Sequence, residues 1–163
     1  MSRNKRNAIG SQFVAHRVEM RWSPAWNALP DNARRVLDRL EREHMDHGAA
    51  ANGSLPCSFD DFEKVGIRRQ SIALAIRQCV ALGFIEVMRQ GRLSISRHRF
   101  AAEYRLTYMN GCGKSTAVTD EWARIKTPDD AIAKLQAASD VRSAGHVHRA
   151  TEARRMKAEA EAA

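Results

Sequence analysis

Apolar residues between positions 23 and 48 recur every three or four residues, as one face of a helix requires. Ser23 suits the N-cap of a short helix, because its hydroxyl can accept a backbone hydrogen bond and a proline follows it. Pro30 suits the restart of a longer helix, and Gly48 suits its end. This stretch therefore predicts a short helix followed by a longer one.

The residues from 58 to 83 predict two more helices with a tight turn between them. Ser58 can cap the first helix, an acidic pair in its first turn complements the helix dipole, and Gly66 ends it. The second helix lies within IRRQSIALAIRQCVALG, where Gly83 follows its end. Its apolar residues form one stripe: Ile72, Ala75, Ile76, Cys79 and Val80.

Extended segments surround these helices. One is centred on residues 55–57, and FIEVM alternates apolar and polar residues as a strand does. RQGR then predicts a glycine-containing turn, and LSIS and EYRLTY predict further extended segments. The order helix, strand, helix, helix, hairpin is that of a winged helix-turn-helix. The predicted fold is therefore mainly α with a small β-hairpin wing, in the α+β class.

The chain divides into four predicted parts. Residues 1–22 form a basic flexible arm, 23–108 the winged-helix domain, 109–126 a loop with the segment TDEW, and 127–163 a helix followed by an alanine-rich tail. The tail has too few large apolar residues to bury a core, so we predict disorder, the alternative being a helix that forms against a partner. The three tryptophans are predicted packing anchors: Trp22, Trp26 and Trp122.

Positive charge is concentrated in one segment. The 163 residues carry a net charge of +8 at pH 7, and residues 64–105 hold nine basic and two acidic side chains. Such a segment favours polyanionic partners, above all nucleic acid. The absence of an 18-residue apolar run and of a signal-peptide core predicts a cytoplasmic, nucleoid-associated protein with no membrane partner. Three cysteines without CxxC spacing predict reduced thiols and no metal site.

Four stretches carry a family pattern: NGSLPCSFDDFEKVGIRRQSIALAIRQCVALGFIEV, QGR, AEYRLTY and, after a variable loop, TDEW. They resemble winged helix-turn-helix DNA-binding domains, and more narrowly those of small plasmid and phage replication initiators and related mobile-element proteins. The resemblance covers about residues 23 to 126. It implies a recognition helix in the DNA major groove and a wing beside it.

The face opposite the apolar stripe of the second helix is small and basic. A recognition helix places its N-terminal residues nearest the base edges, where arginine can bond guanine, and glutamine adenine, in two places. The predicted base readers are Arg69, Gln70 and Arg77. Arg68 and Ser71 are predicted phosphate contacts, because a helix N-terminus attracts phosphate. The alternative interpretation is an ordinary solvated charged face.

Basic residues also mark the predicted wing and arm. The predicted wing contacts, to phosphate or to the minor groove, are Arg89, Arg92, Arg97 and Arg99, with His98 beside them. The predicted arm contacts, to an adjacent groove, are Arg3, Lys5 and Arg6. The alternative for the arm is an exposed terminus that binds nothing.

The motif GCGKST, residues 111–116, raises nucleotide hydrolysis through Lys114 as one hypothesis. A phosphate loop needs an earlier glycine where this chain has Tyr108, so a turn after a strand is the favoured interpretation. The adjacent carboxylates Asp60 and Asp61 fit helix capping better than catalysis. We predict a protein that is not an enzyme and that uses no cofactor.

The predicted function is sequence-specific binding of double-stranded DNA, as a transcription regulator or replication-associated factor of a plasmid, phage or integrative element. Further predicted partners are a second copy of the chain or replication and transcription proteins. The alternative from a different class is a non-enzymatic adaptor between proteins of a replication or transfer complex, because fold does not dictate function.

Overall fold

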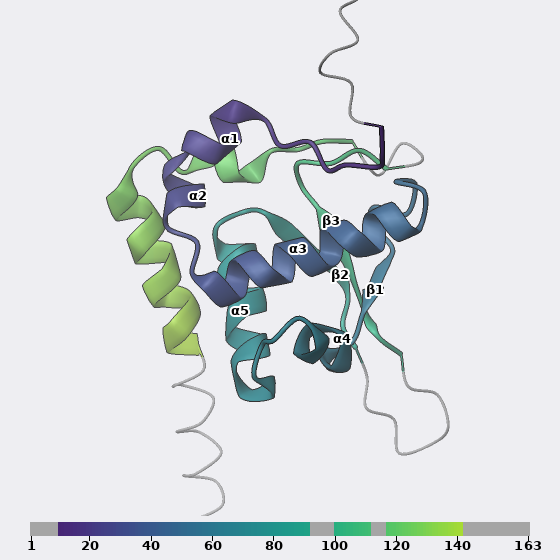
Figure 1. Ribbon diagram of the computed structural model, residues 1–163. Helices are drawn as coiled ribbons and strands as arrows, with labels where there is room; N and C mark the ends of the chain where they lie inside the picture. The colour runs from purple at the N-terminus through teal and green to yellow at the C-terminus, as the bar shows by residue number, and fades with distance from the viewer. Residues whose placement is uncertain (1–9, 92–99, 112–116, 142–163) are drawn as a thin grey trace, which may run out of the picture.

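The computed structural model describes residues 10–91, 100–111 and 117–141, which form a mixed α+β fold (Figure 1). Helices pack on a three-stranded antiparallel sheet with the strand order β1-β3-β2. The elements in chain order are α1 (Val18–Trp22), α2 (Pro24–Asn27), α3 (Asp31–Asp46), β1 (Leu55–Cys57), α4 (Phe59–Lys64), α5 (Arg69–Ala81), β2 (Ile85–Arg89), β3 (Ala102–Leu106), η3 (Glu121–Arg124) and a helix over residues 128–141.

Capping side chains begin α2 and α4 at the serines that the sequence indicates. Ser23 starts α2 by accepting a hydrogen bond from the Trp26 N–H at 3.1 Å. Ser58 and Asp61 form a reciprocal capping box on α4, with the Ser58 N–H donating to the Asp61 carboxylate at 3.0 Å. The hydrogen bond from the Ser58 side chain, followed by that from Lys64, holds the pKa of Asp61 well below its usual range. Each cap stabilises its helix by about 1 kcal/mol.

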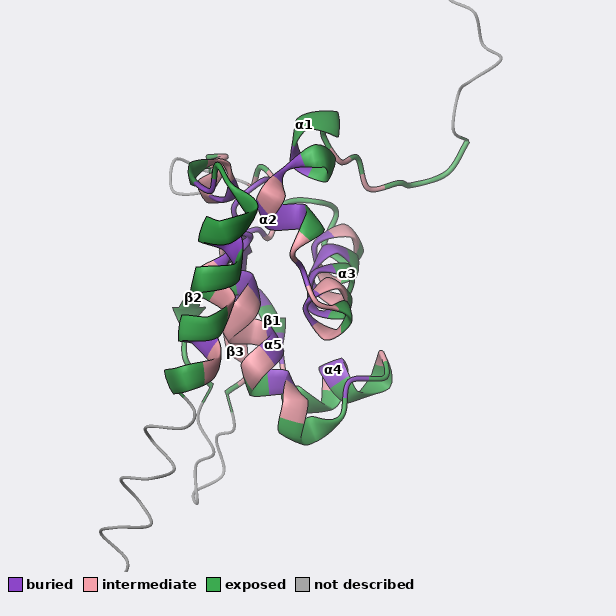
Figure 2. Ribbon diagram, turned by 90° about the vertical axis from the view of Figure 1, so that its left-hand side faces the viewer, coloured by how far each residue is buried: buried purple, intermediate pink, exposed green. Residues whose placement is uncertain are grey.

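The hydrophobic core lies between α3, α5 and the sheet. α3 packs on α5, β1 and β3, and α5 also packs on β2. Figure 2 shows that the buried faces of these elements lie toward the interior, while the helix over 128–141 is exposed along its outer side. The largest fully buried side chains include Phe62, Phe84, Tyr104, Leu37, Leu40, Ile72 and Leu106.

Asn52 joins the loop before β1 to the end of β3. Its side chain accepts a hydrogen bond from the Leu106 N–H at 2.7 Å and donates to the carbonyls of Leu106 at 2.8 Å and Met109 at 2.6 Å. The residue is buried, so each of these backbone groups has a partner where water does not reach. This clamp positions the start of β1 against the middle strand.

The flexible arm predicted over residues 1–22 is wrong for the part nearest the domain. Val18–Trp22 forms α1, and His16 packs with its ring centroid 5.4 Å from that of Trp26. The His16 Nε2 also lies 2.8 Å from a carboxylate oxygen of Glu41 on α3. These contacts join residues far apart in the chain, which apolar spacing does not report. Residues 1–9 lie outside the described residues.

Two of the three tryptophans anchor the packing as predicted, and one does not. Trp26 and Trp122 are each 6% exposed, whereas Trp22 on α1 is 78% exposed. Ile125, next to η3, is buried in the same core. The segment 109–126 is therefore in part a component of that core rather than a separate loop.

The structure has the helix predicted after Thr127, over residues 128–141. The Thr127 hydroxyl accepts a hydrogen bond from the Asp130 N–H at 3.1 Å and so caps the helix. Ala131 and Ala138 are its buried residues, whereas Ile132, which the sequence places on the apolar edge, is 50% exposed. Residues 142–163, the predicted tail, lie outside the described residues.

We expect Gly83→Ala to lower the free energy of unfolding by at least about 2 kcal/mol. Gly83 has φ +76°, and an added Cβ would lie 2.7 Å from backbone atoms of Glu121 and Trp122. Gly48 provides a matched control, because its φ is +64° but nothing lies within 4 Å of an added Cβ. Gly48→Ala therefore isolates the conformational cost, about 1 kcal/mol. Equal losses for both variants in urea denaturation would contradict the close contact at Gly83.

Candidate nucleic-acid interface

Helix α5 presents its first two turns to solvent. It buries Ile72, Ala75 and Cys79, and the Cys79 thiol donates a hydrogen bond to the Ala33 carbonyl of α3 at 3.2 Å. This packing turns Arg69 and Gln70, along with Arg68 before them and Ala73 after them, to the exposed side. Gln70, a predicted adenine reader, is therefore at the surface.

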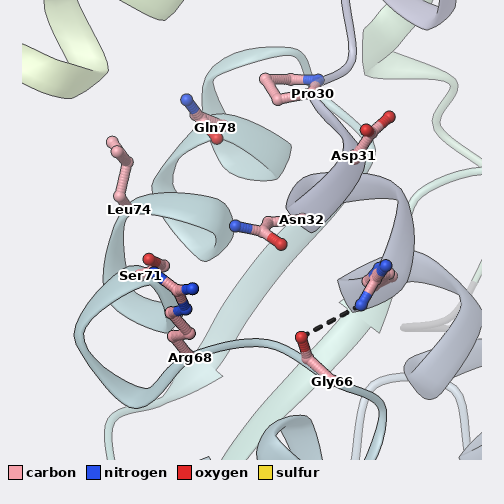
Figure 3. A pocket seen from close by; sticks show the side chains of 9 residues that line it. Pro30, Asp31, Asn32, Gly66, Arg68, Ser71, Leu74 and Gln78 are labelled. Carbon is pink, nitrogen blue, oxygen red and sulfur yellow. Dashed lines mark hydrogen bonds between the residues drawn. The ribbon is translucent and has the colours of Figure 1, made fainter.

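Arg68 and Ser71 line a groove between the N-termini of α3 and α5 (Figure 3). The groove has a volume of about 530 Å³ and is lined largely by polar side chains, including those of Asn32 and Gln78. Neither helix has a side-chain cap on its first-turn N–H groups. The acidic Asp31 lies in the first turn of α3 and also lines the groove, so of the two helix ends it is that of α5, beside Arg68 and Ser71, that favours a negatively charged group.

Arg35 belongs to the same groove and was missed from the sequence. It comes from the second turn of α3, and its Nη1 donates to the Gly66 carbonyl at 3.0 Å. Figure 3 marks this bond with a dashed line at Gly66, across the groove from Arg68 and Ser71. An arginine on the polar face of a helix gives no signal of this role in the sequence, because only the packing of α3 on α5 brings it to the α4–α5 turn.

Arg69 is exposed but held by two carboxylates of α4. Its Nη1 donates to Asp60 at 2.6 Å and to Glu63 at 2.5 Å, and its guanidinium carbon lies 5.9 Å from the centre of the Phe59 ring. The hydrogen bond to Asp60, followed by that to Glu63, raises the pKa of Arg69, so the side chain stays charged. The predicted guanine reader is therefore at the surface in a defined orientation.

Arg77 does not lie on the open face, so its prediction as a base reader is wrong for this structure. Its Nε donates to the Ala138 carbonyl at 3.0 Å, and its Nη2 is buried without a hydrogen-bond partner among the described residues. The helix over 128–141 covers it, with the small side chains of Ala131 and Ala138 buried. The periodicity of α5 identifies its outer face, but not a later helix that packs there.

Of the predicted wing residues the structure describes Arg89, at the end of β2. It donates to Glu103 of β3 at 2.5 Å, and its guanidinium lies 5.2 Å from the centre of the Phe100 ring. Figures 1 and 2 place the end of β2 and the start of β3 at the same end of the molecule as α4 and the start of α5. The remaining predicted wing and arm contacts lie outside the described residues: Arg92, Arg97, His98, Arg99, Arg3, Lys5 and Arg6.

The described residues offer little chemistry beyond this surface. Among them, no three His, Cys, Asp or Glu side chains group so as to hold a metal ion. Cys57 and Cys79 are buried, and burial raises the pKa of the Cys57 thiol to about 12. Tyr108, which stands where a phosphate loop needs glycine, is buried and donates a hydrogen bond to Glu41. Most of the GCGKST motif lies outside the described residues.

Comparisons with protein-family models, curated proteins and solved structures found no match for this chain. Within the part of the chain that the structure describes, no helix is both long and apolar enough to cross a membrane. The site must therefore be interpreted from its own geometry.

We expect Ala131→Glu to release the helix over 128–141 from α5. Ala131 is fully buried, so a charged side chain cannot be placed there without displacing the helix. Ala133, two residues away, is exposed and provides the matched control Ala133→Glu. Amide hydrogen exchange is expected to rise at least about tenfold in this helix for Ala131→Glu, with protection in α3 unchanged. Equal exchange in the two variants would contradict the docking of this helix.

Proposed function

We propose that this chain is a winged helix-turn-helix protein that binds double-stranded DNA sequence-specifically, as a transcription regulator or replication-associated factor of a plasmid, phage or integrative element. The element order α3, β1, α4, α5, β2, β3 supports the fold assignment, since it is the order of a winged helix with α4 and α5 as the helix-turn-helix. The short connection from α4 to α5 through Gly66, at φ +83°, supports it further.

One observation carries the DNA-binding proposal. The exposed residues Arg69 and Gln70 follow Arg68 at the uncapped N-terminus of α5, next to the groove. The groove also contains Arg35 and Ser71, together with the acidic Asp31 of α3. A recognition helix needs this combination, since phosphate contacts fix its position on the duplex and neighbouring side chains read the bases.

The reading surface is confined to the first two turns of α5. The third turn carries Arg77 beneath the helix over 128–141, so Arg77 serves to hold that helix. Base contacts then come from Arg69 and Gln70, with Ala73 small enough to let the helix approach the groove floor. Contact through the N-terminal end is the usual geometry of a recognition helix.

A protein adaptor is the second candidate function. The observation that favours it is α1, where Val18 is 67% and Trp22 78% exposed. These residues are four apart and share one face of the helix, where a partner protein could bury them. Both functions can coexist in one chain, because α1 and the α4–α5 turn lie at different ends of the molecule (Figure 1).

We expect the full chain to bind random duplex DNA more tightly than single-stranded DNA or duplex RNA. Fluorescence anisotropy at several salt concentrations is expected to give a log-log slope steeper than about −4, which corresponds to several phosphate contacts. Binding to none of the three near physiological salt, or a slope near zero, would contradict the proposal and favour the adaptor.

Alanine substitutions distinguish contacts to base edges from contacts to phosphates. We expect Arg69→Ala to cost about 1 to 3 kcal/mol on a selected duplex and to relax its base preference, because the contact is to a base edge. Arg68→Ala is expected to weaken binding to all sequences alike and to reduce the salt slope by about 1. Arg124→Ala, at an exposed position of η3 that does not line the groove, is the control and should leave binding unchanged. Equal, sequence-independent losses for Arg68→Ala and Arg69→Ala would contradict the assignment of Arg69.

A further inference from the structure

Two carboxylates of α4 bind one nitrogen of Arg69. Asp60 and Glu63, one turn apart on α4, both accept from Nη1, at 2.6 and 2.5 Å. These bonds leave the edge formed by Nε and Nη2 for another ligand. That edge carries two parallel N–H donors, the arrangement that pairs with O6 and N7 of guanine.

Helix stabilisation accounts for the two carboxylates only in part, because Asp60 also complements the helix dipole in the first turn of α4, whereas Glu63 lies beyond that turn. The capping box of α4 uses Asp61, whose carboxylate bonds Ser58 and Lys64 instead. Exposed ion pairs contribute little to the free energy of unfolding, and the side chains of Asp60 and Glu63 are 71% and 39% exposed. The pair therefore fits a role at the surface, where Arg69 meets its ligand.

The adjacent Arg68 provides a contrast. Among the described residues no carboxylate lies within ion-pair distance of Arg68, whereas Arg69 has two. Phosphates occur at every step of DNA, so an arginine that binds phosphate does so at any sequence, and nothing in the described structure steers Arg68 away from phosphate. Carboxylates beside Arg69 repel phosphate and fix the guanidinium, which favours a base edge over the backbone.

We propose that Asp60 and Glu63 are specificity-determining residues, which hold Arg69 for a guanine edge and keep it from DNA phosphates. This inference rests on the proposed function, because it assigns a role to residues that support a reading arginine. They act through Arg69 and do not themselves contact the base, so they are positioning residues. Phe59, over which the guanidinium lies, limits its movement on the remaining side.

The test compares the full chain with Asp60→Asn/Glu63→Gln on two duplexes, one selected from a random library by the unaltered chain and one scrambled. The amides keep the shape of the carboxylates and remove their charge. We expect the affinity ratio of selected to scrambled duplex to fall at least about fivefold, the lower end of what one bidentate arginine contact supplies. Binding to the scrambled duplex is expected to tighten, with a salt slope steeper by about 1.

Two controls make the result specific to Arg69. Asp46→Asn removes one exposed carboxylate at the far end of α3 and is expected to leave the ratio unchanged. In an Arg69→Ala background, Asp60→Asn/Glu63→Gln is expected to change neither the ratio nor the salt slope, because the residue through which they act is gone. Circular dichroism checks that α4, with its Ser58–Asp61 cap intact, remains folded.

The outcomes distinguish this inference from the proposed function. If the unaltered chain selects a sequence but Asp60→Asn/Glu63→Gln keeps its affinity ratio, or changes it equally in the Arg69→Ala background, the inference is wrong and DNA binding stands. If the unaltered chain selects no sequence at all, the proposed function fails and the inference fails with it.

Discussion

The packing of α5 against α3 is the constraint that decides which side chains form the candidate nucleic-acid interface. The two helices meet through small side chains, Ala33 on α3 and Ala75 and Cys79 on α5, and the Cys79 thiol bonds the Ala33 carbonyl at 3.2 Å. Small residues let helices approach closely, so α5 cannot rotate about its axis without losing this contact. The rotation of α5 decides which residues face outward. With this packing, Arg69 and Gln70 face solvent, and Ser71 faces the groove beside α3.

The C-terminal end of α5 is also fixed, by close contacts of the residue Gly83 that follows it. Gly83 turns the chain with a positive φ where the backbone of Glu121 and Trp122 comes within reach of its missing Cβ. The Thr107 hydroxyl donates to the Gly83 carbonyl at 2.7 Å, and the amides of Thr119 and Asp120 donate to the Thr107 carbonyl. This contact brings η3 against the end of α5 and directs the following helix along its side. The third turn of α5 is covered for this reason, and the first two turns remain exposed.

Local signals in the sequence predicted the elements, and non-local packing limited the prediction of the site. Ser23, Ser58 and Gly66 act on neighbouring residues, so the beginnings and ends of helices could be predicted from the residues themselves. Arg77 was assigned to the open face because its position on α5 is opposite the core, but a helix more than 50 residues later covers it. Arg35 is the opposite case: it lines the groove, but it was not predicted, because no residue near it in the sequence indicates the groove.

The distribution of charge could also be predicted only in part from the sequence. The number of basic side chains in residues 64–105 overstates the unpaired positive charge at the surface. Residues 64–105 contain nine basic side chains, yet several are paired in the described structure. Arg105 is buried and bonds Glu86, Arg89 bonds Glu103, and Arg69 bonds two residues of α4. The carboxylates that offset Arg69 lie before the basic segment or at its edge, so a count along the chain assigns them elsewhere. Pairing lowers the attraction to any phosphate while leaving directed N–H groups in place. For the sequence-specific binding proposed above, directed N–H groups contribute more than unpaired charge does.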